Sequence, residues 1–179
     1  MFDWLKAIYF KKAMSEALAQ NPAVERMKLP LAQIKTVGIL FNGPEERYYP
    51  QIEAFAKALG SDRQVDFLAY IPVSQKKLGV RNMPYTFFLN NLVNWFGIPS
   101  GLKIDQFMNK RFDLLLYLCD EPMPTLEYMM ALSKSKCRMG RYTEGKEYCY
   151  DLMVNVPETA TVPELIYAVQ YALQQVNHN

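Results

Sequence analysis

Two short polar segments follow two apolar runs of the chain, and they hold most of the side chains that could do chemistry. The first run is TVGILFN at 36–42 and the second is FDLLLYL at 112–118. The candidate ligand-binding residues are Asn42, Gly43 and Glu45 at the first run, and Cys119, Asp120 and Glu121 at the second. If both runs are neighbouring strands of an open α/β sheet, these residues lie at its carboxyl edge, where such sheets bind ligands.

The carboxylates at this edge allow two interpretations. Asp120 and Glu121, together with Glu45 and Glu46, could hold Mg²⁺ or act as acid and base. Acidic residues are also common in first helical turns, where they interact favourably with the helix dipole, and Asp120-Glu121-Pro122 is typical of a solvated turn. We favour the second interpretation and predict no catalytic residue here.

The turn after the first run, FNGPEER, is poorly suited to phosphate. A phosphate site needs backbone amides at a helix N-terminus and no nearby anions. Pro44 has no amide hydrogen, and Glu45 and Glu46 are acidic. The chain also contains neither G-x-G-x-x-G nor G-x-x-x-x-G-K-S/T. We therefore predict that no nucleotide, and no other cofactor, is bound.

Arg138 and Arg141 are the last two candidate ligand-binding residues, and they form a local basic patch with Lys134 and Lys136. Such a patch could hold an anion or a carboxylate. The simpler expectation, which we favour, is a solvated rim in which each cation is hydrated.

A metal site is not expected. Cys119, Cys137 and Cys149 show no C-x-x-C spacing, and the one histidine, His178, is next to the last residue. A three-cysteine site would require three separate elements to converge. The cysteines are therefore predicted to be buried, unreactive thiols.

Apolar runs alternate with helical segments along the chain, which is typical of a mainly parallel sheet with helices on both faces. Strands are expected at 36–42, 65–72, about 85–89, 112–118, 136–142 and 150–156. Helices are expected at 1–20, within 44–60 (beginning at Pro44 or near Pro50), at 103–111, 125–134 and 161–176. The unbroken FDLLLYL run predicts a central strand that is buried on both faces and parallel to TVGILFN.

These elements predict an α/β fold: a three-layer, Rossmann-like or flavodoxin-like sheet, mainly parallel, with an added N-terminal helix. We divide the chain into an N-terminal helix and connector at 1–35 and a single α/β domain at 36–179.

Apolar side chains surround the predicted N-terminal helix instead of marking one stripe. They are Trp4, Leu5, Ile8, Tyr9, Phe10 and Met14. Such a helix must be covered on more than one side. It can pack across its own domain, on a second subunit, or on a membrane surface, and the last is disfavoured because its charges are poorly segregated. We predict that one face packs on its own sheet layer or the final helix, and that the other forms a homodimer.

The composition excludes several classes of protein. Of the 179 residues, 50% are hydrophobic, and the formal net charge is +2 with both signs mixed. These values predict a packed globule and no nucleic-acid partner. Three cysteines without a close pair are typical of a reducing compartment, so a cytoplasmic location is expected. No apolar run is long enough for a membrane span, and the N-terminus lacks the features of a signal peptide.

Four segments carry a resemblance to known proteins: NWFGIP at 94–99, RFDLLLYL at 111–118, ALSKSKCRMGRY at 131–142 and YDLMVNV at 150–156. They resemble an uncharacterised bacterial domain-of-unknown-function family of short Rossmann-like α/β proteins. The resemblance implies a fold but no activity.

A weaker resemblance concerns only FDLLLYL and ALSKSKCRMGRY. These segments are similar to the acceptor-side domain of the heptosyltransferase-like glycosyltransferases. Those enzymes need a second domain for the nucleotide-sugar, and 179 residues leave no length for it. The likeness therefore implies topology rather than transferase activity.

The sequence thus favours a non-catalytic binding or interaction module whose ligand is not specified. The alternative is a small enzyme, or a degenerate glycosyltransferase-like domain, with its site at the carboxyl ends of the central strands. A deep polar cleft at that place would favour the enzyme. A shallow cleft, or one filled by Tyr and Phe, would favour the module.

Overall fold

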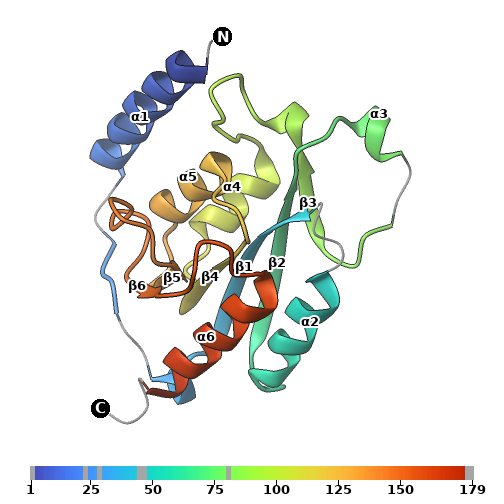
Figure 1. The fold of residues 1–179 in the computed structure, drawn as a ribbon, viewed down its shortest axis with the longest axis vertical. Helices are drawn as coiled ribbons and strands as arrows, with labels where there is room; N and C mark the ends of the chain where they lie inside the picture. Colours follow the sequence, from blue (N-terminus) through green and yellow to red (C-terminus); the bar gives the residue numbers. More distant parts are fainter. Residues whose placement is uncertain (1–2, 22–23, 28–29, 44–47, 80–81, 176–179) are drawn as a thin grey trace.

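Six parallel strands form one sheet at the centre of the molecule (Figure 1). The computed structural model describes residues 3–21, 24–27, 30–43, 48–79 and 82–175. The strand order is β3-β2-β1-β4-β5-β6, which is the order of the doubly wound Rossmann fold. The strands are β1 (Thr36–Asn42), β2 (Gln64–Ile71), β3 (Thr86–Leu89), β4 (Leu114–Leu118), β5 (Arg138–Arg141) and β6 (Leu152–Val154). The predicted fold class is confirmed.

The predicted pairing of the TVGILFN and FDLLLYL runs is also confirmed. β4 lies parallel to β1, in register from Val37 opposite Leu114 to Phe41 opposite Leu118. Every residue of β4 is buried, as expected for a strand covered on both faces. Gly38 permits this close packing, because a Cβ there would come within 2.8 Å of Leu115 and Phe112 side-chain atoms.

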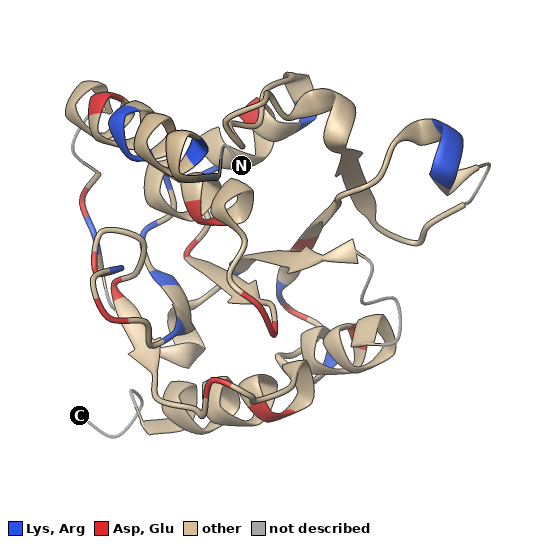
Figure 2. Ribbon diagram, turned by 45° about the horizontal axis from the view of Figure 1, so that its top comes forward, with Lys and Arg blue, Asp and Glu red and all other residues tan. Residues whose placement is uncertain are grey.

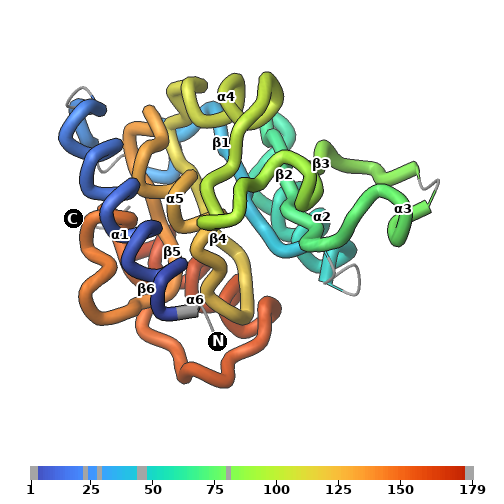
Figure 3. Tube along the Cα trace, turned by 90° about the horizontal axis from the view of Figure 1, so that it is seen from above, coloured from blue at the N-terminus to red at the C-terminus, as the bar shows by residue number. Residues whose placement is uncertain are grey.

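Helices cover both faces of the sheet, with α4 and α5 on one face and α2 and α6 on the other (Figure 1). The helices are α1 (Asp3–Gln20), α2 (Tyr49–Ala58), α3 (Gln75–Leu78), α4 (Leu102–Asn109), α5 (Pro124–Leu132) and α6 (Val162–Gln175), with 3-10 turns at Leu31–Gln33 and Asn90–Leu92. The connection that carries α3 projects away from the sheet edge (Figures 1 and 3). No helix within these described ranges is long and apolar enough to cross a membrane.

The N-terminal helix α1 lies outside the α5 layer (Figure 3). It buries Phe10 and Met14 in the cluster that also contains the sheet core, and the Phe10 ring meets that of Tyr128 on α5 at 6.3 Å in an edge-on arrangement. The expectation that this face packs on the sheet layer or the final helix is therefore wrong, because α5 already covers the sheet there. The proposed division of the chain at residue 35 stays a prediction.

The start of β4 is joined to the connector by one carboxylate. Asp113 accepts hydrogen bonds from the Lys35 and Thr36 amides at 2.9 Å and pairs with Lys136 Nζ at 2.7 Å. Burial acts to raise the pKa of Asp113, but the hydrogen bonds from Lys136 and from the two amides outweigh it and lower the pKa to about 2. Asp113 therefore remains ionised and holds the connector to the sheet.

Candidate functional site

The carboxyl end of β4, where the sequence predicted a ligand, is nearly filled. The cavity beside Cys119 and Asp120 has a volume of about 10 Å³, which is room for one water at most. Tyr117 and Tyr150 occupy the space, with their rings stacked at 6.3 Å. The Tyr117 hydroxyl accepts a hydrogen bond from the Met123 amide at 2.9 Å, so the end of β4 is tied to the start of α5.

The other predicted residues at this edge are Asn42, Gly43, Glu45 and Glu121. Asn42 ends β1, and its Oδ1 is buried without a hydrogen-bond partner in the described part of the chain. Gly43 is tightly enclosed, because a Cβ there would come within 2.2 Å of Ile71. Glu121 is exposed, and its amide donates to Asp120 Oδ1 at 2.9 Å. Glu45 lies outside the described residues. Ligand binding by these residues stays a prediction.

Arg138 is not part of a solvated basic rim, so that expectation is wrong. Its guanidinium is buried and binds both carboxylate oxygens of Asp151 at 3.0 Å. It also donates to the carbonyl oxygens of Tyr148 at 2.9 Å and Ala131 at 3.1 Å. Arg138 therefore links β5 to α5 and to the segment before β6, and its charge is neutralised within the protein.

Arg141 is also buried. Its two terminal nitrogens donate to the carbonyl oxygens of Glu158 at 2.7 Å and Ala160 at 2.6 Å. Its Nε is buried with no hydrogen-bond partner among the described residues. The sequence showed two arginines in a basic stretch, but it did not show that distant carbonyls and Asp151 would enclose them.

An open pocket of about 700 Å³ lies beside this closed region, under the first half of α1. We call it the α1 pocket. It is lined by residues of α1, the end of β2, the segment after β3, the start of α5 and the loop before β6: Lys6, Ala7, Phe10, Lys11, Tyr70, Asn90, Val93, Asn94, Trp95, Phe96, Gly97, Met123, Pro124, Thr125, Glu127, Lys146 and Tyr148. It therefore opens at the carboxyl edge of the sheet, next to the predicted place.

A tight turn at 94–97 forms one wall of the α1 pocket. Asn94 Oδ1 accepts hydrogen bonds from the Phe96 and Ile98 amides, both at 3.0 Å, and Gly97 adopts a φ of +89° that suits glycine. The turn presents Trp95 and Phe96 to α1. The Phe96 ring lies 4.8 Å from that of Tyr9, and Lys6 Nζ lies 5.1 Å from the Trp95 ring centroid. Asn94 therefore shapes the turn.

Comparison with known proteins gives a family but no activity. The chain matches, over residues 6–167, the model of a family described as "Family of unknown function (DUF6913)". The chain belongs to this family. The matched range includes the pocket-lining part of α1 from Lys6 onward. No curated protein and no solved structure matches the chain.

In this member of the family, the lining of the α1 pocket contains a partly buried ion pair. Glu127 is buried, and its Oε2 lies 2.7 Å from Lys146 Nζ. Burial acts to lower the pKa of Lys146, but its hydrogen bond and charge interaction with Glu127 outweigh burial and raise the pKa. Lys6 and Lys11 add two further cations to the lining. The described lining thus holds three lysines and one glutamate, so its net charge is positive.

Sequence reasoning missed this site because its parts are far apart in the chain. The aromatic, Asn-rich segment at 85–96 and the apolar N-terminal helix are both visible in the sequence. Neither pattern indicated that the two would face each other. In the described residues, no group of three or more His, Cys, Asp or Glu side chains is arranged to hold a metal ion.

Proposed function

We propose that this protein is a non-catalytic binding module, and that the α1 pocket holds an apolar molecule with an anionic end group. The observation that carries the proposal is the contrast in volume at the carboxyl edge: about 700 Å³ under α1 and about 10 Å³ at the end of β4. A pocket of several hundred cubic ångströms is the usual size for a small organic ligand.

The apolar part of the ligand follows from the walls. Phe10, Tyr70, Trp95, Phe96 and Tyr148 contribute aromatic rings to the lining. Aromatic walls bind flat or flexible apolar groups well, because they remove a large area from water.

The anionic end follows from the charges. Glu127 is already paired with Lys146, whereas neither Lys6 nor Lys11 forms an ion pair within the part of the chain that the structure describes. The α5 helix also begins at the pocket with Pro124, and a helix N-terminus favours negative charge. A cationic ligand is disfavoured, because Lys6 and Lys146 already lie over the Trp95 and Tyr148 rings at 5.1 and 5.9 Å.

The lack of catalysis is supported by the state of the buried titratable groups. Burial, followed by the charge of Glu127, raises the pKa of Cys149 to about 12. Burial also raises the pKa of Tyr117 and Tyr150 well above the usual range of tyrosine. These groups remain protonated near neutral pH, where they are poor nucleophiles and bases. A glycosyltransferase-like site at the end of β4 is disfavoured because no sugar fits in about 10 Å³.

The test uses 1-anilinonaphthalene-8-sulfonate, an aromatic anion whose fluorescence rises on binding. We expect saturable binding that decanoate displaces and that decanol displaces at least about tenfold more weakly. Ala7→Trp should abolish binding by filling the pocket, whereas Ala19→Trp, on the exposed surface of the same helix, should not. Equal displacement by decanol contradicts the anionic end group, and unchanged binding by the Ala7 variant contradicts the site.

We also propose that the outer face of α1 pairs two copies of the chain. Of the six predicted interface residues, Phe10 and Met14 are buried, and Leu5 is half-buried. Trp4, Ile8 and Tyr9 are 62%, 53% and 48% exposed, and Trp95 next to the helix is 55% exposed. Such a cluster of large apolar side chains is unusual on a free surface.

Sedimentation of the intact protein tests this pairing. We expect a dimer at micromolar concentration and a monomer for the double variant Trp4→Ser, Ile8→Ser, with Lys76→Ser as the control. A monomeric parent protein contradicts the pairing. If the parent protein is monomeric and sediments with anionic vesicles, the outer face of α1 contacts a membrane surface instead.

A cytoplasmic location completes the proposal. All three cysteines are buried thiols outside any disulfide, which supports a reducing compartment. Basic and acidic residues are interspersed over the helices and strands rather than gathered on one face (Figure 2).

A further inference from the structure

One half of β2 has a neighbour on one side only. β3 pairs with β2 from Leu68 opposite Thr86 to Ile71 opposite Leu89. On the other side of β2, β1 pairs with it from Gln64 to Tyr70. At residues 64–67 the outer side of β2 therefore faces no strand within the described ranges. Unpaired strand edges are templates for another strand.

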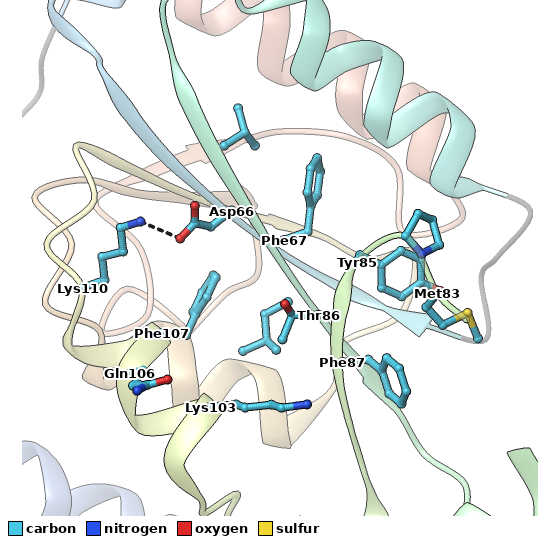
Figure 4. A pocket seen from close by; sticks show the side chains of 13 residues that line it. Asp66, Phe67, Met83, Tyr85, Thr86, Phe87, Lys103, Gln106, Phe107 and Lys110 are labelled. Carbon is cyan, nitrogen blue, oxygen red and sulfur yellow. Dashed lines mark hydrogen bonds and ion pairs between the residues drawn. The ribbon is translucent and has the colours of Figure 1, made fainter. Parts of the chain in front are cut away.

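A groove of about 830 Å³ runs along this edge (Figure 4). We call it the edge groove. Its lining comes from β2, from the segment that leads into β3, and from α4: Val65, Asp66, Phe67, Leu68, Met83, Pro84, Tyr85, Thr86, Phe87, Lys103, Gln106, Phe107 and Lys110. It is separate from the α1 pocket, since the two share no lining residue.

The backbone of β2 directs hydrogen-bonding groups toward the edge groove. The Gln64 amide donates to the Lys35 carbonyl oxygen at 2.8 Å, which places this amide on the β1 side. Backbone groups of successive strand residues alternate between the two sides. The N–H and C=O of Val65 therefore point toward the outer side, where an added strand would bind them.

Two chemically different surfaces flank this edge. On the α4 side, Lys110 Nζ lies 2.6 Å from Asp66 Oδ2, and Lys103 is exposed with its Nζ 6.0 Å from the Phe87 ring centroid. The groove thus has two lysines and one aspartate, a net charge of +1. On the α2 side, Phe67 is half-buried, and its ring lies 5.9 Å from that of Tyr49.

We propose that the edge groove binds an extended segment of a partner protein in which acidic and apolar residues alternate. The segment adds to β2 at Val65, in line with β3. Because successive side chains of a strand point to opposite faces, its acidic residues face Lys103 and Lys110, and its apolar residues face Phe67. Recognition by strand addition combines backbone hydrogen bonds for affinity with alternate side chains for specificity.

The test measures fluorescence anisotropy of a labelled, end-blocked peptide Val-Glu-Val-Glu-Val-Glu with the full chain. We expect saturable binding, and binding at least about tenfold weaker for Val-Lys-Val-Lys-Val-Lys. Val65→Pro should weaken binding by a similar factor because it removes the outward N–H. Proline is tolerated where that group faces no partner strand, and circular dichroism checks that the variant folds.

Lys103→Glu supplies a second variant that leaves the backbone intact. It should weaken binding of the acidic peptide about fivefold and strengthen binding of the lysine peptide. Lys76→Glu makes the same charge change at an exposed position outside the groove and should alter neither affinity.

Three results overturn the proposal: no binding of the acidic peptide at millimolar concentration, equal binding of both peptides, or affinities that neither variant changes. If Val65→Pro instead turns a dimer into a monomer and no peptide binds, the edge joins two copies of this chain, and the proposal is also overturned. Charged residues beside a strand edge can also serve only to prevent aggregation through that edge. If that is their only role here, no peptide should bind.

Discussion

The two halves of the carboxyl edge use their aromatic residues in opposite ways. At the end of β4, Tyr117 and Tyr150 stack on each other and leave about 10 Å³. Under α1, the aromatic rings line a space of about 700 Å³ without filling it. The rule that α/β sheets bind ligands at this edge therefore identifies a region, and side-chain packing decides which part of it is open.

The difference follows from the origin of the elements on each side. The closed half is built by β4, β5 and the segment before β6, which buried hydrogen bonds from Arg138 hold together. The open half is built where α1, a helix outside the three layers, meets the turn at 94–97. We expect substitutions in the closed half to change stability and substitutions in the open half to change binding.

Arg138→Ala should produce the largest loss of stability. A small loss would contradict the view that the closed half of the edge determines stability. Removing the guanidinium leaves Asp151 without its bidentate partner in a mostly buried place, which typically costs about 3–5 kcal/mol. Urea unfolding measures this loss as a fall in the free energy of unfolding. Lys12→Ala removes an exposed pair with Glu16 and should cause no measurable change. A loss below about 1 kcal/mol for Arg138→Ala would show that the closed half is not held by this network.

The pH dependence of stability should show the contribution of Asp113, which anchors the other end of β4. Its pKa is about 2 in the folded state, against an ordinary aspartate value of 3.8. Because the folded pKa is lowered, the stabilisation is complete above about pH 4 and is lost as the pH falls toward 2. We expect about 1–2 kcal/mol after allowing for solvent screening.

Unfolding curves at pH 6 and at pH 2.5 check this expectation. Asp113→Asn should be less stable at pH 6 and should lose less stability on acidification than the parent protein. Equal losses for both proteins would assign the acid sensitivity to other carboxylates.

Tyr117→Phe tests a single hydrogen bond of the closed half, because it removes only the hydroxyl oxygen. The Met123 amide then loses its acceptor, and an unsatisfied buried donor costs about 1–2 kcal/mol. Thermal unfolding followed by circular dichroism measures the change. Tyr142→Phe, at a position that is about half exposed, should have no effect, and equal melting temperatures for the two variants would contradict the assigned role of the hydroxyl.

Trp95→Ala should give the smallest change in stability and a clear change in binding. The side chain is 55% exposed, so its removal should cost less than about 1 kcal/mol. It also forms a wall of the α1 pocket and meets the Phe96 ring edge-on, so affinity for 1-anilinonaphthalene-8-sulfonate should fall about tenfold. A large loss of stability with unchanged affinity for Trp95→Ala would contradict the assignment of binding to the open half.

The sequence by itself determined the sheet and its central strands. The apolar runs at β1 and β4 are local patterns, and an uninterrupted apolar strand is stable only when both faces are covered. The same holds for the apolar stripe of α6, which predicts a helix packed on one side. These features depend on side-chain hydrophobicity and on the repeat of the backbone, both of which are readable along the chain.

Only the tertiary structure decided where the pocket lies and what the arginines do. Arg138 and Asp151 are 13 residues apart, and the walls of the α1 pocket come from α1, the segment after β3, the start of α5 and the loop before β6. Whether a cleft is filled depends on side-chain volumes that meet from distant segments, and whether a charge is solvated depends on the groups that enclose it. Neither the filling of a cleft nor the solvation of a charge has a periodic pattern in the sequence, so both are known only from the folded structure.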